Sequence, residues 1–236
     1  MKLAILAKSP SPDSVSEFAK TGSTAIDNFL TDDAAESLLL ELQSVGRWQE
    51  IFTGNGKTYE MSAADFEELS DEQRANITLL THTAALDELQ YRYRSIRVSE
   101  DPAERADRGL AIDKFSDLMN SPATLQYLRG VTGLEAIDFV DAQATAYRAG
   151  SFLTNHDDDV EGKNRLAAYV FSLTPHWSMD WGGLLLLESG KSVSGFIPAF
   201  NSLRIFSVPI KHCVSVVAPW VEETRYSITG WLRYSS

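Results

Sequence analysis

From residue 136 onward, the sequence alternates between short apolar segments and turn residues, and this pattern restricts the fold more than any other feature. The segments with the composition of β-strands are residues 137–147, 166–173, 183–187, 202–208, 213–217 and 226–232. Gly162, Pro175, Gly182, Gly190 and Pro209 fall between them. Short strands separated by turns at this spacing predict a double-stranded β-helix, or jelly roll.

The preceding part of the chain is mostly helical in pattern. A helix is predicted over residues 31–45, with Thr31 as N-cap, acids in its first turn and leucines at helical spacing. Ser70 and Gln73 have the spacing of a capping box, and Ser121-Pro122 begins a further helix. These helices are expected to support the jelly roll by covering one of its sheets.

Other N-terminal segments carry weaker signals. Residues 1–25 are interpreted as an arm, the Gly-Asn-Gly sequence at 54–56 as a hairpin turn, and residues 99–108 as an exposed polar loop. Residues 90–97 fit a strand or a helix end; their tyrosines and arginines are interpreted as solvated surface, with substrate contact as the alternative.

No linker divides the chain, so we expect a single α+β domain over residues 1–236. It would consist of an arm (1–25), a mostly helical support (26–135) and the jelly-roll core (136–236).

Composition narrows the classes of function and location. A net charge of −12 argues against nucleic acid as the main ligand, because binding a polyanion requires a basic surface. A single cysteine excludes an internal disulfide and favours a reducing compartment. The N-terminal apolar run is too short for a signal peptide, and no window has the apolar length of a membrane span. The prediction is a cytoplasmic protein without a membrane partner.

The histidines suggest a metal site on the roll. His156 and Asp158 are two positions apart, and on a β-strand such residues point to the same face. His212 follows 54 residues later, at the start of another predicted strand. Two histidines and one carboxylate make the facial triad of non-haem Fe(II) oxygenases. Asp157 or Asp159 as the ligand, and an acidic turn that binds no metal, remain alternatives.

A second polar group lies near the C-terminus. Arg225 and Ser227 share a face if residues 226–232 form a strand. A guanidinium inside a barrel is costly unless it has an anionic partner, and its geometry matches a carboxylate. This pair therefore predicts a ligand that has a free carboxylate at one end. A plain structural ion pair of Arg225 is the alternative.

Over residues 147–233 the sequence resembles the Fe(II)- and 2-oxoglutarate-dependent dioxygenases, closest to their prolyl-4-hydroxylase-like branch. The resemblance rests on Tyr-Arg-Ala-Gly at 147–150, His-Asp-Asp at 156–158 and Trp-Gly-Gly at 181–183. It continues through His212 to Arg-Tyr-Ser-Ile-Thr-Gly-Trp at 225–231.

The resemblance implies that His156, Asp158 and His212 bind Fe(II). It gives Arg225 the distal carboxylate of 2-oxoglutarate, with Ser227 as a helper and Tyr147 as a hydroxyl near the co-substrate. The interval from His212 to Arg225 is slightly longer than in the family, which we attribute to a turn at 219–223.

The implied activity is hydroxylation of a C–H bond with O2, releasing succinate and CO2, with ascorbate as a candidate accessory reductant. The prime substrate stays open between a peptidyl proline, a free amino acid and another small molecule. Two other interpretations remain: a cupin-type metal dioxygenase without an oxo-acid co-substrate, and a non-catalytic jelly-roll binding module. Arg225 with Ser227 argues against the cupin-type enzyme, and the complete histidine–aspartate set argues against the binding module.

Overall fold

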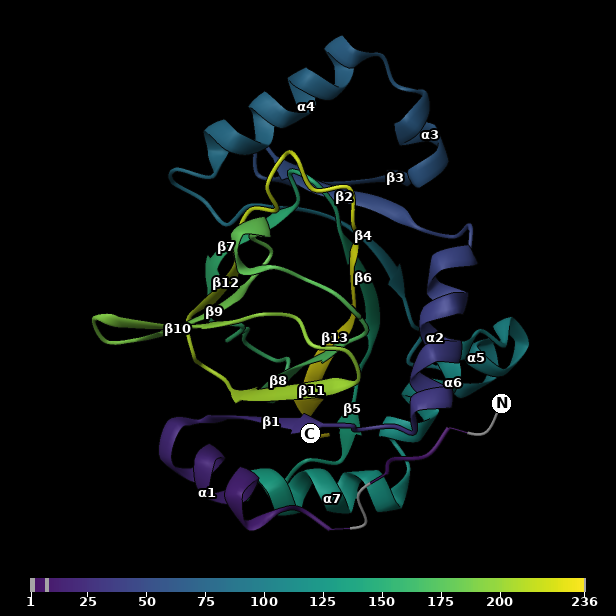
Figure 1. Cartoon of the computed structure of the whole chain (residues 1–236), viewed down its shortest axis with the longest axis vertical. Helices are drawn as coiled ribbons and strands as arrows, with labels where there is room; N and C mark the ends of the chain where they lie inside the picture. Colours follow the sequence, from purple (N-terminus) through teal and green to yellow (C-terminus); the bar gives the residue numbers. More distant parts are fainter. Residues whose placement is uncertain (1–2, 7–8, 236) are drawn as a thin grey trace.

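A curled antiparallel sheet forms the centre of the molecule in the computed structural model, which describes residues 3–6 and 9–235 (Figure 1). Its strands are β1 (Ser23–Asp27), β2 (Gln49–Gly54), β3 (Lys57–Ser62), β4 (Tyr91–Arg97), β5 (Phe139–Val140), β6 (Gln143–Tyr147), β7 (Phe152–His156), β8 (Arg165–Ser172), β9 (Leu185–Ser189), β10 (Ser192–Phe196), β11 (Ser202–Ser207), β12 (His212–Val214) and β13 (Arg225–Arg233). Neighbouring strands follow the order β1-β11-β8-β13-β6-β4-β7-β12-β9-β10. The α+β jelly-roll prediction is confirmed.

Two adjacent rows of paired residues show how the sheet separates its faces. One row consists of apolar residues in register across six strands: Ile26, Leu203, Phe171, Ile228, Ala144 and Ile96. The next row consists of Asp27, Ser202, Ser172, Ser227, Thr145 and Ser95. Because successive residues of a strand point to opposite faces, the apolar row packs into the main core and the hydroxyl row faces the inside of the roll.

Helices cover the outer face of the sheet. They are α1 (Pro12–Thr21), α2 (Asp32–Ser44), α3 (Ala63–Glu68), α4 (Asp71–Ala84), α5 (Pro102–Arg108), α6 (Ala111–Met119) and α7 (Pro122–Thr132). Figure 1 shows α2, α5 and α6 on the right, α1 and α7 below, and α3 with α4 at the top. Leu38, Phe115 and Leu128, from α2, α6 and α7, are fully buried in the main core.

Several local predictions are confirmed. Ser70 and Gln73 form the capping box of α4, and Ser121 caps α7 through the backbone N–H of Thr124. β2 and β3 form a hairpin around Asn55 and Gly56, both of which have positive φ. The 90–97 segment is a strand, β4, and it belongs to the roll because it pairs with both β6 and β7.

Two N-terminal predictions are wrong. Residues 1–25 are not a plain arm, because α1 and the start of β1 lie in them; residues 1–2 and 7–8 are outside the described residues. Ser11 accepts a hydrogen bond from the N–H of Ser14, and Phe18 is buried, which fixes α1 against the body. The 99–108 segment contains α5, capped by Asp101 and held by the buried Arg105, which pairs with Asp117.

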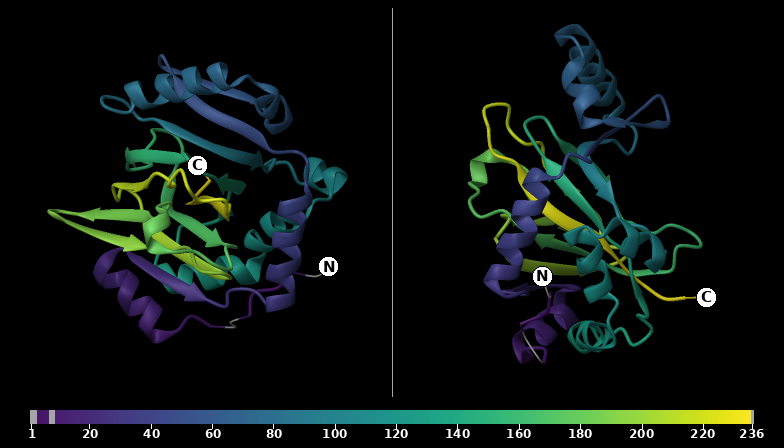
Figure 2. Two further views of the ribbon diagram at one scale, coloured as in Figure 1. Left: turned by 45° about the horizontal axis from the view of Figure 1, so that its top comes forward. Right: turned by 90° about the vertical axis from the view of Figure 1, so that its right-hand side faces the viewer.

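The turned views in Figure 2 show α3 and α4 standing apart from the other helices, beside the β2–β3 hairpin. Among the described residues, no helix combines the length and the apolar character needed to cross a membrane.

Candidate active site

Two neighbouring strands of the sheet, β7 and β12, bring the predicted histidines together. His156 ends β7 and His212 begins β12, and the two residues are paired in register. Their ring centroids are 4.1 Å apart. Each Nδ1 contacts a backbone carbonyl, His156 that of Thr154 at 3.0 Å and His212 that of Ile210 at 2.8 Å. Because a carbonyl only accepts, each Nδ1 carries the hydrogen, and each Nε2 faces the site.

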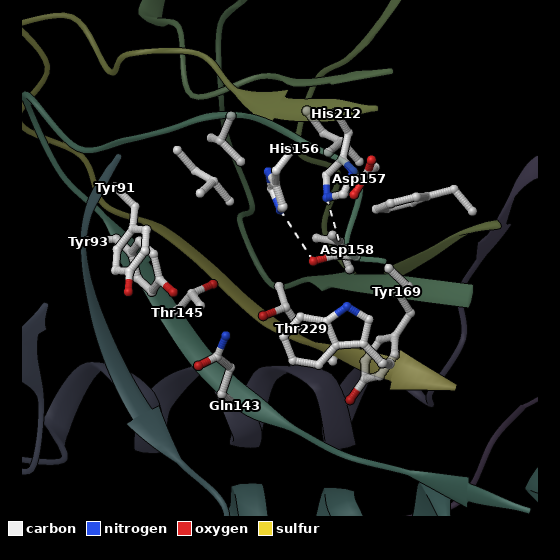
Figure 3. Close-up of a pocket in the computed structure, with 18 of the residues that line it drawn as sticks. Tyr91, Tyr93, Gln143, Thr145, His156, Asp157, Asp158, Tyr169, His212 and Thr229 are labelled. Carbon is white, nitrogen blue, oxygen red and sulfur yellow. Dashed lines mark ion pairs between the residues drawn. The ribbon is translucent and has the colours of Figure 1, made fainter. Parts of the chain in front are cut away.

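Asp158 completes the group, but not as the next residue on the same face of a strand. β7 ends at His156, and Asp158 lies beyond it in the left-handed conformation, with φ of 64°. This turn directs the carboxylate back to the histidines, 3.4 Å from Nε2 of His156 and 3.3 Å from Nε2 of His212. Figure 3 shows the three side chains pointing toward one another.

The electrostatics of the group suit a bound cation. Burial raises the pKa of Asp158, but hydrogen bonds from His156 and His212 outweigh this effect and leave the pKa below its ordinary value. Burial lowers the pKa of His156, and the hydrogen bond and charge of Asp158 reverse the balance, so that this pKa is raised. The carboxylate thus stabilises positive charge at the position that the Nε2 atoms face.

The donor set fits a divalent transition metal. One ligand atom from each of His156, Asp158 and His212 lies within 4.8 Å of the others. Backbone hydrogen bonds at Nδ1 fix the ring orientation and tautomer, as they do in metal-binding histidines generally. Asp157 and Asp159 line the cavity onto which this group opens, but they are not part of the group.

The group opens onto a cavity of about 470 Å³ inside the roll. Arg225, from β13, lines this cavity and is 3% exposed. Among the described residues, no acidic side chain pairs with it, and its Nε has no hydrogen-bond partner. Burial lowers the pKa of the Arg225 guanidinium. A buried cation in this state requires an anionic ligand to offset its desolvation.

Tyr147 and Ser227 are both placed beside Arg225. Tyr147 is paired with Arg225 across β6 and β13, and burial raises the pKa of its hydroxyl. Ser227 is fully buried and belongs to the inner hydroxyl row. In the same row, the Oγ atoms of Ser95 and Ser172 are buried without a partner among the described residues. Of the hydroxyl-bearing residues near Arg225, Tyr147 and Thr145 line the cavity, whereas Ser227, Ser95 and Ser172 are buried and do not line it.

Sequence reasoning did not identify Arg165 or the position of Trp231. The Arg165 guanidinium stacks 3.5 Å from the centre of the Trp231 ring, and its Nη1 donates to the carbonyl of Asp158 at 3.2 Å. Both residues line the cavity. The seven-residue step from Asp158 to Arg165 carries no local signal, because the two meet only through the turn between β7 and β8.

The tyrosines of β4 also belong to the cavity. Tyr91 and Tyr93 line it, and burial raises the pKa of Tyr93 to about 12. Arg92 and Arg94 point to the other face of β4, where both pair with the buried Glu50. The interpretation of this segment as solvated surface is therefore wrong for its tyrosines, which line the cavity. The alternation of tyrosine and arginine in the sequence could have indicated that the two residue types face opposite sides of a strand.

The other histidines lie outside the group. His82 packs against Phe152, with ring centroids 5.7 Å apart, and His176 packs edge-on against Trp181. The roles of these two residues are consistent with packing alone.

The sequence is similar to a known enzyme family and to individual members of it. Residues 142–233 match the model of the 2OG-Fe(II) oxygenase superfamily. The chain is 34% identical over 114 residues to prolyl 3-hydroxylase OGFOD1 of Mus musculus, which covers 44% of this chain and 20% of the relative. For the Xenopus laevis protein of the same name, the identity is 35% over 115 residues, 45% of this chain and 22% of the relative. The chain thus spans about a fifth of the length of these relatives.

Solved structures share the fold. A Pseudomonas putida prolyl-4-hydroxylase matches with a TM-score of 0.58 and 18% identity, over 95% of this chain and 98% of the other. A Trichoplax adhaerens prolyl hydroxylase, solved with a peptide fragment of hypoxia inducible factor, matches with a TM-score of 0.61 and 20% identity, over 93% and 87% of the chains. The similarity extends over the helical support as well as the roll.

Proposed function

We propose that the chain is an Fe(II)- and 2-oxoglutarate-dependent dioxygenase that hydroxylates a C–H bond, and the match of residues 142–233 to the model of the 2OG-Fe(II) oxygenase superfamily supports this. The whole chain, residues 1–236, is proposed to act as one domain, with the helical support fixing the roll. A prolyl group is the favoured prime substrate, on the basis of the names of the similar enzymes.

One observation supports this function most strongly. The cavity is lined by a metal-binding group, formed by His156, Asp158 and His212, and by the buried guanidinium of Arg225, which pairs with no acidic side chain in the described part of the chain. A ligand that chelates a metal at one end and carries a carboxylate at the other satisfies both. 2-Oxoglutarate has this chemistry, with an oxo-acid end and a distal carboxylate.

The proposed roles of the residues follow from their positions. His156, Asp158 and His212 would hold Fe(II) on one face, which leaves the cavity side of the ion open. Arg225 would bind the distal carboxylate of 2-oxoglutarate, with Ser227 and Tyr147 as neighbouring hydroxyl donors. When bound, the iron would supply the oxidising chemistry with O2 as the oxidant: one oxygen atom would convert 2-oxoglutarate to succinate and CO2, and the other would hydroxylate the C–H bond.

The protein also shapes the space for the prime substrate. Tyr91, Trp231 and Arg165 line the same cavity as the metal-binding group. Apolar rings enclose a substrate and exclude water, while the cationic Arg165 suits a carbonyl or carboxylate oxygen. A peptidyl proline, a free amino acid and another small molecule all remain compatible with this lining. A cytoplasmic location, which the single cysteine favours, stays a prediction.

The two alternative functions differ in what they require. A cupin-type dioxygenase without an oxo acid has no need for the unpaired Arg225, and a binding module has no need for the ordered histidines. We therefore favour the 2-oxoglutarate-dependent enzyme over both.

Incubation of the purified protein with Fe(II), 2-oxoglutarate and O2 tests the proposal. Succinate formation that depends on Fe(II) and is lost in His156→Ala is the expected result. Iron binding without consumption of the oxo acid would favour the cupin-type enzyme, and the absence of metal binding would favour the binding module.

A further inference from the structure

The stem of Arg225 packs against a position that has no side chain. A Cβ added to Gly183 would lie 3.0 Å from Cγ2 of Val217, 3.1 Å from Cζ2 of Trp177 and 3.6 Å from Cδ of Arg225. Because Gly183 has no side chain, the side chains of Arg225, Trp177 and Val217 can all approach its Cα closely. Trp177 and Val217 are both buried, so neither can retreat toward solvent to admit a methyl group.

The backbone around Gly183 is fixed to the neighbouring loop. The N–H of Gly183 donates to the carbonyl of Ser215 at 3.1 Å, and the N–H of Ala218 donates to the carbonyl of Trp181 at 2.9 Å. A Cβ on Gly182 would lie 1.9 Å from the carbonyl oxygen of Val216, so the two loops are in direct backbone contact. These contacts make the wall behind Arg225 a rigid surface.

Trp177 connects this wall to the cavity. Its indole Nε1 donates to the carbonyl of Gly182 at 2.8 Å, which fixes the ring plane. The ring packs in the same apolar cluster as Tyr147 and Val217. The guanidinium carbon of Arg225 lies 5.1 Å from the centre of the Tyr147 ring, so the arginine contacts both Tyr147 and the surface around Gly183 and Trp177.

We propose that Gly183 and Trp177 are positioning residues for Arg225, and that they hold its guanidinium at the depth that suits the distal carboxylate of 2-oxoglutarate. This inference rests on the proposed function, because it concerns the same co-substrate. A methyl group at position 183 would press on the arginine stem and displace the guanidinium, while none of the three atoms nearest to it belongs to His156, Asp158 or His212. The expected loss is therefore confined to ligands that carry a distal carboxylate.

The test compares two oxo acids on Mn(II)-loaded protein by calorimetric titration. 2-Oxoglutarate has the distal carboxylate, whereas 2-oxopentanoate has the same five-carbon chain without it. The ratio of their affinities should fall at least tenfold in Gly183→Ala, with the affinity for Mn(II) within twofold of the wild type. Gly190→Ala is the matched control, because Gly190 has the same φ of 61° and an added Cβ there meets nothing within 4 Å.

Trp177→Phe provides a second test if Gly183→Ala does not fold, because it removes the hydrogen bond to Gly182 and the indole benzo ring. If Gly183 and Trp177 only stabilised the fold, their variants would bind both oxo acids and Mn(II) more weakly to the same extent. The ratio of the two oxo-acid affinities would then be unchanged. An unchanged ratio in the folded variants would overturn the inference but not the proposed function. Failure of the wild type itself to prefer 2-oxoglutarate would overturn both.

Discussion

Arg225 lies directly opposite Tyr147 in the antiparallel pair β13–β6, and its guanidinium carbon is 5.1 Å from the centre of the tyrosine ring. An aromatic face partly stabilises a cation but does not replace a carboxylate as its partner. The pair thus defines a buried positive position in the wall of the cavity, where an anionic ligand would offset the charge of Arg225.

Removing the Arg225 guanidinium should weaken the binding of 2-oxoglutarate much more than the binding of the metal ion. A charged hydrogen-bonded pair contributes about 1.5–3 kcal/mol, which corresponds to a rise of roughly 10- to 150-fold in the KM for 2-oxoglutarate in Arg225→Gln. Steady-state kinetics and an Fe(II) titration would measure the two effects separately. Arg204→Gln is a suitable control, since Arg204 stacks on Phe196 and does not line the cavity. An unchanged KM would remove Arg225 from the co-substrate site.

The acids at positions 157 and 158 should behave differently. Asp158→Ala removes the carboxylate that lies between the two imidazoles and should abolish turnover and metal binding. Asp157→Ala should retain most of both, because its carboxylate is outside the metal-binding group. Metal titration of both variants checks the ranking, and the reverse order would transfer the ligand role to Asp157.

Glu67 should give the fold a stabilising contribution that depends on pH. Hydrogen bonds from Arg148 and Arg94 hold the pKa of Glu67 below its ordinary value of 4.5. A lowered pKa in the folded protein means that the contribution is present above 4.5 and is lost as the pH falls through the folded-state pKa. Because Glu67 is half-exposed, the destabilisation in Glu67→Gln at pH 7 should be about 1 kcal/mol or less.

Urea unfolding of Glu67→Gln at several pH values would measure this dependence. The difference from the wild type should narrow at acidic pH, whereas Glu68→Gln should show little difference at any pH, because the exposed Glu68 forms no ion pair among the described residues. A difference that grows on acidification would contradict the assigned pairing.

Asn201 should be important for stability but not for the metal site. Its side chain accepts from the N–H of Leu30 at 2.9 Å and donates to the carbonyl of Leu30 at 2.7 Å, and all of these groups are buried. Asn201→Ala leaves them without partners, at a cost of about 2–4 kcal/mol in unfolding free energy. Asn164→Ala is the control, since Asn164 also has a positive φ but is half-buried. Equal losses in the two variants would attribute the effect to backbone strain.

The sequence predicted most strands because their apolar alternation is local. Arg225 and Ser227 could be placed on one face for the same reason, and the β13 register bears this out. The structure brings His156, Asp158 and His212 together as the sequence predicted, but the argument from strand spacing was incomplete. Strand alternation does not account for Asp158, which turns back toward the histidines through a left-handed residue.

What the sequence could not show depends on contacts between distant segments. Arg165 meets Trp231 only because β8 and β13 are adjacent in the sheet. The N-terminal helix α1 is hard to recognise in the sequence, because its only buried apolar residue is Phe18. Gly183 could be recognised as a turn residue, but its contact with Arg225 requires the three-dimensional structure.

The most direct test of the proposed function is anaerobic titration of the metal-free protein with Fe(II) and then 2-oxoglutarate, followed by visible absorption. The account predicts a metal-to-ligand charge-transfer band on addition of the oxo acid, because the oxo acid would chelate iron held by His156, Asp158 and His212. The band should be absent in His156→Ala. Iron binding without the band, or no iron binding at all, would contradict the central claim.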